Sequence, residues 1–288
     1  MVFATDAHMR LYGVSVLVML LAWLVLYVAA HYVSLLVARS TYVYLLGPEQ
    51  ALWRQSALSI MHAVLVASGG MMIAVFNIPT YTYPMFAYSE QALLFYAATT
   101  AHAIASTLVA LRYVCDDLTA LNRSYRSVVG WETATYCLIG LVGVPTLVAY
   151  RQATWFISTC AVMEVVTPLL ALRRMLQLAG LRASPLYGWL RLAIVTTFVP
   201  VRGGLSLIAL GRIAFHYLDW LDLNPLVRLL GFGVCGAALV SLNAYSATVL
   251  ALSTCRCLAR CAVEHRCCGV TKKEVVVGRR RSDTSVAL

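Results

Sequence analysis

The stretch Cys160–Arg174, CAVMEVVTPLLALRR, decides the fold that we expect for this chain. It is apolar almost throughout, but Glu164 lies in its middle, Thr167 and Pro168 follow one turn later, and two arginines end it. A carboxylate is costly to bury in an apolar run, and a proline inside a helix removes a backbone hydrogen bond. The stretch therefore predicts a membrane-buried helix that carries a polar site, held in place by the rest of the chain.

The composition of the whole chain is that of a membrane protein with several spans. Of its 288 residues, 61% are hydrophobic and only 12% are charged, with a mean hydropathy of +0.79. Soluble domains carry roughly 25% charged residues. The net charge of +10 does not indicate a nucleic-acid partner, because the basic residues lie between apolar runs and in the tail. That distribution is how basic residues set the topology of a membrane protein.

Apolar runs long enough to cross a bilayer predict an all-α membrane protein with about seven transmembrane helices. A span needs about 20 mostly apolar residues, and in lipid its backbone polar groups must be satisfied internally. The predicted spans are Tyr12–Leu36, Gln55–Phe76, Glu90–Leu111, Val128–Tyr150, Ala153–Leu172, Tyr187–Tyr217 and Leu226–Thr254. The sixth is too long for one straight crossing, and Pro200 with Gly203 and Gly204 predicts a kink or break inside it.

The basic residues predict the orientation of these spans. Most lie in segments 37–54, 112–127, 173–191 and 255–288, which alternate with loops that have few. The opposite side carries Arg10, Arg151, Arg212 and Arg228. Because positive loops stay in the cytosol, we expect a lumenal or outside N-terminus and a cytosolic C-terminus.

Glu164 and Arg202 are the expected polar centre of the bundle. Both fall near the middle of their spans at the rise of an α-helix, and ionisable residues inside spans usually face the interior and find partners. We therefore expect an ion pair between them. Such a pair could also do no more than fix the register of the two helices.

Three further polar residues lie inside predicted spans. His62 lies nearer the cytosol than His102, and both could act as a proton shuttle or a general base, or simply as interhelical hydrogen-bonding groups. Asn243 is expected to bond across helices. Neither histidine has the spacing of a metal motif, so we expect no metal and no cofactor.

The tail after the last span is basic and rich in cysteine. S-palmitoylation is expected there because cysteines beside basic residues suit a membrane surface; the candidates are Cys255, Cys257, Cys261, Cys267 and Cys268. Ser282 follows three arginines and resembles a basic-directed phosphorylation site.

Four motifs in the same order resemble the TLC domain family of multi-pass membrane proteins. Trp53-Arg54, Ser56, Ser59 and His62 read like the opening W-x-R-x-x-S-x-x-H of that family. The other three matches are E-x-x-T-P with a downstream arginine at Glu164–Arg174, Phe198 with Arg202, and Leu242-Asn243-Ala244-Tyr245. The resemblance covers residues 50–255 and implies a six-helix bundle, with residues 1–49 as an N-terminal segment holding the first helix and 256–288 as the tail.

The resemblance also implies a lipid-accessible cavity, usually in the endoplasmic reticulum. The family positions that match are implied to line the cavity or to support it: Arg54, His62, Glu164, Thr167, Pro168, Arg202 and Asn243. Ceramide synthases in this family carry a histidine pair that would fall near Trp131 and Glu132, where this chain has no histidine. We therefore transfer no catalytic residue and expect a divergent member.

The expected function is to bind or sense a membrane lipid, such as a sphingolipid or phospholipid, and to influence membrane lipid composition without catalysis. One alternative is a ceramide synthase-like N-acyltransferase in which His102 replaces the absent pair. The other is a cargo receptor or partner-binding protein of the endoplasmic reticulum. The sequence leaves the oligomeric state open, a homo-oligomer included.

Overall fold

The computed structural model describes residues 6–114, 134–249 and 252, and every regular element within them is helical. The predicted all-α membrane architecture is thereby confirmed. The first half contains α1 (Asp6–Val37), α2 (Arg39–Tyr42), α3 (Gly47–Met71), η1 (Met72–Phe76), α4 (Ile78–Thr82), η2 (Glu90–Ala92) and α5 (Leu93–Val114). The second half contains a helix at 134–138, η3 (Ile139–Gly143), α7 (Val144–Tyr150), α8 (Thr154–Val162), η4 (Met163–Val166), α9 (Thr167–Leu178), η5 (Leu181–Ala183), α10 (Pro185–Phe198), η6 (Val199–Gly204), α11 (Leu205–Phe215), α12 (Tyr217–Leu221), η7 (Val227–Gly236) and a helix at 237–249.

Six of the described helices are long and apolar enough to cross a membrane. They are Asp6–Val37, Glu49–Phe76, Glu90–Val109, Thr154–Leu178, Pro185–Phe215 and Val227–Val249. A shorter apolar helix, Ala134–Tyr150, stands where the fourth span is predicted, and the start of that predicted span lies outside the described residues. Each of the seven predicted spans thus coincides with an apolar helix.

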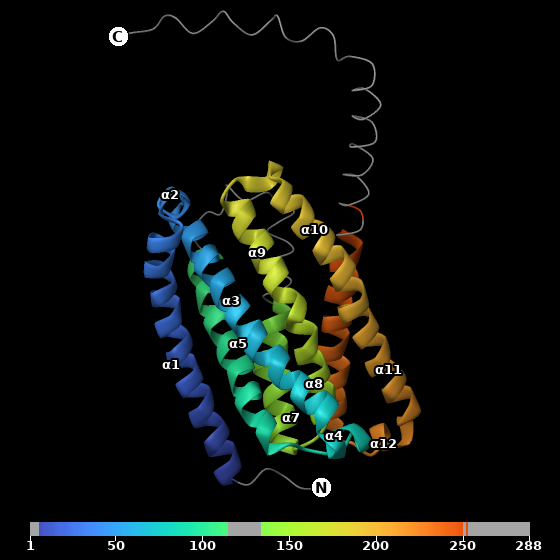
Figure 1. The fold of residues 1–288 in the computed structure, drawn as a ribbon. Coiled ribbons are helices and arrows are strands. Elements are labelled where there is room, and N and C mark those ends of the chain that lie inside the picture. The colour runs from blue at the N-terminus through green and yellow to red at the C-terminus, as the bar shows by residue number, and fades with distance from the viewer. Residues whose placement is uncertain (1–5, 115–133, 250–251, 253–288) are drawn as a thin grey trace, which may run out of the picture. The chain divides into compact units, whose positions relative to one another are not determined.

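The helices run alongside one another as a bundle (Figure 1). α3 packs against α5, α8 and α9, while α1 lies along α5 and also contacts α3. We call the end where α1 finishes, α3 begins and α9 finishes the basic end. There Tyr42, Leu45 and Trp53 pack with Met175 and Leu178.

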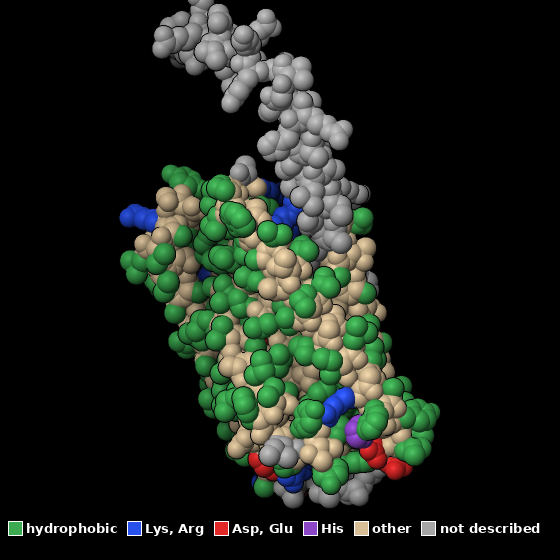
Figure 2. Space-filling model, turned by 45° about the vertical axis from the view of Figure 1, so that its right-hand side comes forward, with side chains coloured by type: hydrophobic (Ala, Val, Ile, Leu, Met, Phe, Trp, Pro, Cys, Tyr) green, Lys and Arg blue, Asp and Glu red, His purple; other side chains and the backbone are tan. Residues whose placement is uncertain are grey.

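The outer surface of the bundle is apolar. Figure 2 shows hydrophobic side chains over the flank, with acidic and most basic side chains gathered toward the ends. Large apolar side chains are exposed even in mid-helix, such as Val25 on α1 and Leu207 on α11. A flank of this kind suits contact with lipid chains. Its side chains are apolar, and the backbone polar groups beneath them are hydrogen-bonded within each helix.

The close approach of α3 to α8 depends on a glycine. A Cβ atom added at Gly70 would lie 2.6 Å from the Ser158 carbonyl oxygen and 2.6 Å from the Ala161 Cβ. Small residues at helix contacts allow this kind of approach in membranes. Gly70 therefore fixes the position of α8, which leads directly into the turn that carries Glu164.

The sixth span accommodates its proline without breaking. α10 and α11 are joined by the π-helical segment η6, which contains Pro200 and both neighbouring glycines. Proline has no N–H to donate, and a π turn absorbs the missing bond while the helix continues. The predicted kink or break is thus a local widening of one helix that runs from Pro185 to Phe215.

The tight turn between α7 and α8 is anchored from a distant part of the chain. Arg151 and Ala153 adopt left-handed backbone angles, φ 52° and 58°, which L-residues adopt at some energetic cost. Arg151 forms an ion pair with Glu90 and lies over the Tyr88 ring. The Ala153 N–H donates to the Met85 carbonyl at 2.9 Å. The Ala153–Met85 hydrogen bond holds the start of α8, and the exposed Arg151–Glu90 pair lies beside it.

Candidate functional site

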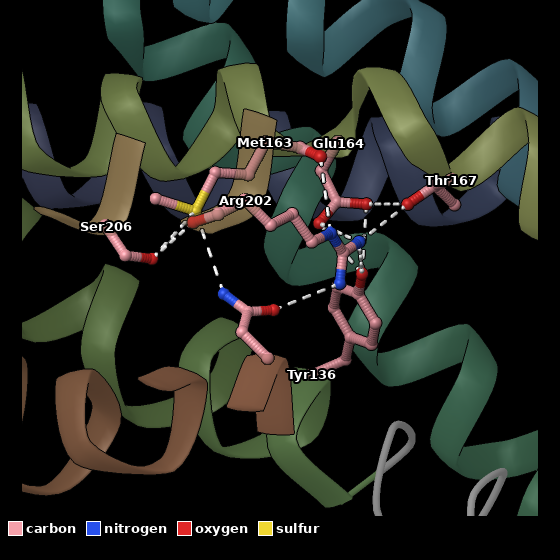
Figure 3. A network of polar contacts seen from close by, with 7 residues as sticks. Tyr136, Met163, Glu164, Thr167, Arg202 and Ser206 are labelled. Carbon is pink, nitrogen blue, oxygen red and sulfur yellow. Dashed lines mark hydrogen bonds and ion pairs between the residues drawn. The ribbon is translucent and has the colours of Figure 1, made fainter. Parts of the chain in front are cut away.

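Arg202 is buried in the middle of the bundle, where its side chain forms hydrogen bonds with residues of four helical segments. Its side chain is 4% exposed, and Nη2 lies 3.5 Å from Glu164 Oε1, so the ion pair predicted from the sequence is present. Figure 3 shows the surrounding contacts, which we call the Arg202 network: Tyr136, Met163, Glu164, Thr167, Arg202, Ser206 and Asn243.

Two hydroxyl groups bridge the ion pair. Tyr136 donates to the Glu164 carboxylate at 2.8 Å and accepts from Arg202 Nη2 at 3.2 Å. Thr167 donates to Glu164 Oε2 at 2.6 Å and accepts from the same Nη2 at 3.0 Å. Each charge is therefore satisfied by the other and by two neutral hydroxyls, which is what a buried pair requires to be tolerated.

The far side of the guanidinium is also occupied. Arg202 Nη1 donates to Asn243 Oδ1 at 3.3 Å, and Nε donates to the Met163 carbonyl at 3.4 Å. Asn243 therefore bonds across helices as expected from the sequence. The Phe198 ring lies 5.3 Å from the guanidinium carbon.

Irregular turns beside two prolines carry the pair. Pro168 cannot donate to the Glu164 carbonyl four residues earlier. The N–H of Thr167, the residue that follows the 3-10 segment η4, donates to that carbonyl instead. Arg202 lies in the π segment η6 together with Pro200. π segments are frequent at functional sites, since they change the direction of the side chains that follow.

His62 on α3 and His102 on α5 form a stacked pair. Their ring centroids are 4.1 Å apart and the planes differ by 13°, and both rings meet the Trp23 ring edge-on. Both residues are buried, at 3% and 8% exposure. Within the described part of the chain, His62 Nε2 and His102 Nδ1 have no hydrogen-bond partner, while His102 Nε2 is 3.5 Å from the Ser106 hydroxyl. A buried polar atom without a partner requires an explanation, and a ligand is one.

The stacking brings together two histidines that were predicted at different depths. His62 was expected nearer the cytosol than His102, and in the structure their ring centroids lie 4.1 Å apart. α3 begins at Gly47, eight residues before the predicted Gln55, and includes both Glu49 and Arg54.

A small cavity joins the histidine pair to the Arg202 network. Its volume is about 50 Å³, which is room for a few water molecules. Its lining comprises Gln55, Ser59, His62, His102, Ser106, Tyr136, Glu164, Thr167, Leu170, Ala171, Arg174 and Arg202. We call it the polar cavity.

A larger and mostly apolar pocket adjoins the polar cavity. Its volume is about 390 Å³, and its lining comprises Trp23, Leu24, Tyr27, Arg54, Gln55, Leu58, His102, Ala105, Ser106, Leu108 and Val109. The two spaces share Gln55, His102 and Ser106. We call the larger one the apolar pocket, and its side chains come from α1, α3 and α5.

The structure thus brings together most of the residues singled out from the sequence. His62, His102, Glu164, Thr167 and Arg202 line the polar cavity. Three other residues do not line the polar cavity. Arg54 lines the apolar pocket, Pro168 lies in the first turn of α9, and Asn243 accepts a hydrogen bond from Arg202. The five tail cysteines, Cys255, Cys257, Cys261, Cys267 and Cys268, lie outside the described residues, as does Ser282.

Several lining residues had no signal in the sequence. Tyr136, Gln55 and Ser106 are single polar side chains in or beside apolar runs, and nothing in their spacing distinguishes them from residues that face a neighbouring helix. Tyr136 would have been found if every hydroxyl group inside a predicted span had counted as a candidate for hydrogen bonding across helices. Among the residues that the structure describes, no three His, Cys, Asp or Glu side chains are grouped as metal ligands.

No protein-family model matches the chain, and no curated protein matches it.

Proposed function

We propose that this protein binds a membrane lipid inside the bundle, influences membrane lipid composition or homeostasis, and does so without catalysis. The observation that carries the proposal is the junction of the polar cavity with the apolar pocket through Gln55, His102 and Ser106. A ligand there meets hydrogen-bonding groups on one side and about 390 Å³ of apolar space on the other, a size typical of small-molecule sites. An amphiphile has a polar part for the hydrogen-bonding groups and an apolar part for the apolar space.

The pocket also has a route to the bilayer. Leu24 on α1 and Leu108 on α5 line it and are 45% and 54% exposed. Side chains that belong both to a pocket and to the lipid-facing surface mark a lateral opening. A lipid could enter there without crossing water, which favours a membrane lipid over a soluble metabolite.

The proposal extends to family and location. The four ordered motifs support a divergent TLC domain, and through it the endoplasmic reticulum. The basic end carries Arg39, Arg173, Arg174, Arg182 and Arg191, which favours a cytosolic position for it. The N-terminus would then face the lumen or the outside, and the C-terminus the cytosol.

Replacing Leu108 with Trp should displace the bound lipid. The indole would extend across the opening and into the pocket, so lipid retained by the purified protein should fall at least several-fold. Native mass spectrometry of protein extracted in mild detergent measures the retained lipid. The matched control is Leu207→Trp, which adds the same ring to the 71% exposed position on α11. Equal lipid retention by the two variants would contradict the proposal, as would a wild-type protein that carries no lipid.

A second candidate function is acyl transfer from a thioester to a sphingoid base. The stacked histidines favour it, because an imidazole nitrogen without a partner can take the proton of an attacking amine. The amine nitrogen would form a bond to the acyl carbon, the carbon–sulfur bond would break, and the imidazolium would return the proton to the leaving thiolate.

Proteoliposomes supplied with a sphingoid base and an acyl-CoA separate the two functions. We expect no N-acyl product above that of empty liposomes. Product that appears with the wild type and disappears with His102→Ala would replace lipid binding by catalysis as the conclusion, provided that the variant unfolds at the same temperature as the wild type.

A further inference from the structure

The charge of the apolar pocket comes from one side chain. Its lining includes a single guanidinium, that of Arg54, and no carboxylate. Among the residues that the structure describes, Arg54 has no ion-pair partner; its Nε donates to the Gln50 carbonyl at 3.3 Å. The pocket therefore offers a positive charge that nothing on the described chain neutralises.

The setting of Arg54 holds that charge in a fixed orientation. The guanidinium carbon lies 4.4 Å from the centre of the Tyr27 ring, and Tyr27 also lines the pocket. Stacking on a ring fixes the plane of the guanidinium and therefore the direction of its N–H donors. Those donors match the paired oxygens of a carboxylate or a phosphate. An arginine that only extends to the surface would need no such support.

The depth of Arg54 matches the position of a lipid headgroup. It lies seven residues into α3 from Gly47, which places it about 10 Å from the basic end along the helix. On α5 the pocket runs from Val109 inward to His102, which is again about 10 Å. The charge thus lies near the basic end, and the apolar lining extends inward from it toward the polar cavity.

We propose that the apolar pocket takes a single-chain amphiphile whose carboxylate or phosphate headgroup binds Arg54 and whose chain lies along α5 toward His102. The volume of about 390 Å³ suits one chain rather than two. The inference rests on the proposed lipid-binding function and adds to it the charge and the orientation of the ligand.

A series of amphiphiles with one chain length tests the headgroup. Hexadecanoate, hexadecyl phosphate and hexadecanol would compete with a fluorescent fatty acid for wild-type protein in nanodiscs of neutral phosphatidylcholine. We expect the two anions to bind about tenfold more tightly than the alcohol, because a hydrogen bond to a charged headgroup raises the affinity by about that factor. Acetate and inorganic phosphate, which have no chain, should not compete; competition by either would indicate a site for free anions and overturn the proposal.

Variants at the basic end assign the preference to Arg54. Arg54→Gln should remove the tenfold difference and leave the affinity for the alcohol unchanged, while Arg54→Lys should keep part of the difference. Arg182→Gln is the control, because it removes one charge from the same end at an exposed residue outside the pocket. A preference that survives Arg54→Gln, or is lost equally with Arg182→Gln, would overturn the inference.

The outcomes separate this inference from the proposed function. If the alcohol binds the wild type as tightly as the anions, and Leu108→Trp weakens all three, lipid binding stands and the role of Arg54 fails. If none of the three amphiphiles binds the wild type, both fail.

Discussion

Glu164→Gln should lower the free energy of unfolding by about 3 to 5 kcal/mol, because it leaves a buried arginine without a charge partner. The Arg202 side chain is 4% exposed, so bulk solvent does not replace the carboxylate. The hydroxyls of Tyr136 and Thr167, which donate to Glu164, would also lose their charged acceptor. Unfolding of the purified protein by SDS in mixed micelles measures the change.

A matched substitution at the end of the bundle provides the control. Glu90 also pairs with an arginine, Arg151, but its side chain is 60% exposed. Exposed pairs contribute about 0 to 1 kcal/mol, so Glu90→Gln should have a small effect. The double variant Glu164→Leu with Arg202→Met should recover part of the loss, since two apolar side chains leave no isolated charge. Equal effects of the two glutamate substitutions would contradict a buried, mutually dependent pair.

Gly70→Ala should destabilise the bundle by about 1 to 3 kcal/mol, as overpacking of a close contact does. The added Cβ would meet a backbone oxygen, that of Ser158, at 2.6 Å, and a backbone atom can move only with its helix. α8 would move away from α3, and with it the turn that carries Glu164. The same variant should therefore also retain less lipid, measured by native mass spectrometry alongside SDS unfolding.

Gly211→Ala is the control for that substitution. A Cβ at Gly211 on α11 would meet nothing within 4 Å, and alanine favours a helix over glycine by up to about 1 kcal/mol. We expect the Gly211 variant to be as stable as the wild type or slightly more so. A Gly70 variant that behaves in the same way would show that the α3–α8 contact does not constrain the bundle.

Hydropathy predicts this fold well because the surrounding lipid determines the secondary structure of each spanning segment. In lipid, a spanning segment must satisfy its own backbone, so an apolar run of sufficient length becomes a helix whatever its neighbours are. The Glu164–Arg202 pair was predictable for a related reason: two opposite charges at one depth have few partners other than each other. Those two rules account for the spans and for the centre of the site.

The remaining contacts depend on how each helix is rotated about its axis, which hydropathy does not determine. Nearly uniform apolar faces leave Tyr136 free to point in any direction, and only the packed bundle turns its hydroxyl between Glu164 and Arg202. The histidine stack was not predicted for the same reason, because hydropathy does not show which side of α3 or α5 faces the other helix. The π segment at Pro200 was expected as a kink or break, because sequence rules describe what proline removes and not how neighbouring turns adjust.

Mapping a photoreactive lipid onto the chain tests the central claim most directly, namely that a lipid occupies the joined cavities. A fatty acid with a diazirine in its chain would be activated on wild-type protein in nanodiscs, and the labelled peptides identified by mass spectrometry. We predict labelling concentrated on residues 23–27, 54–58 and 102–109, which hold the lining of the apolar pocket, and lost with Leu108→Trp. Labelling spread over the exposed faces of α1 and α11, and unchanged by that substitution, would contradict the account.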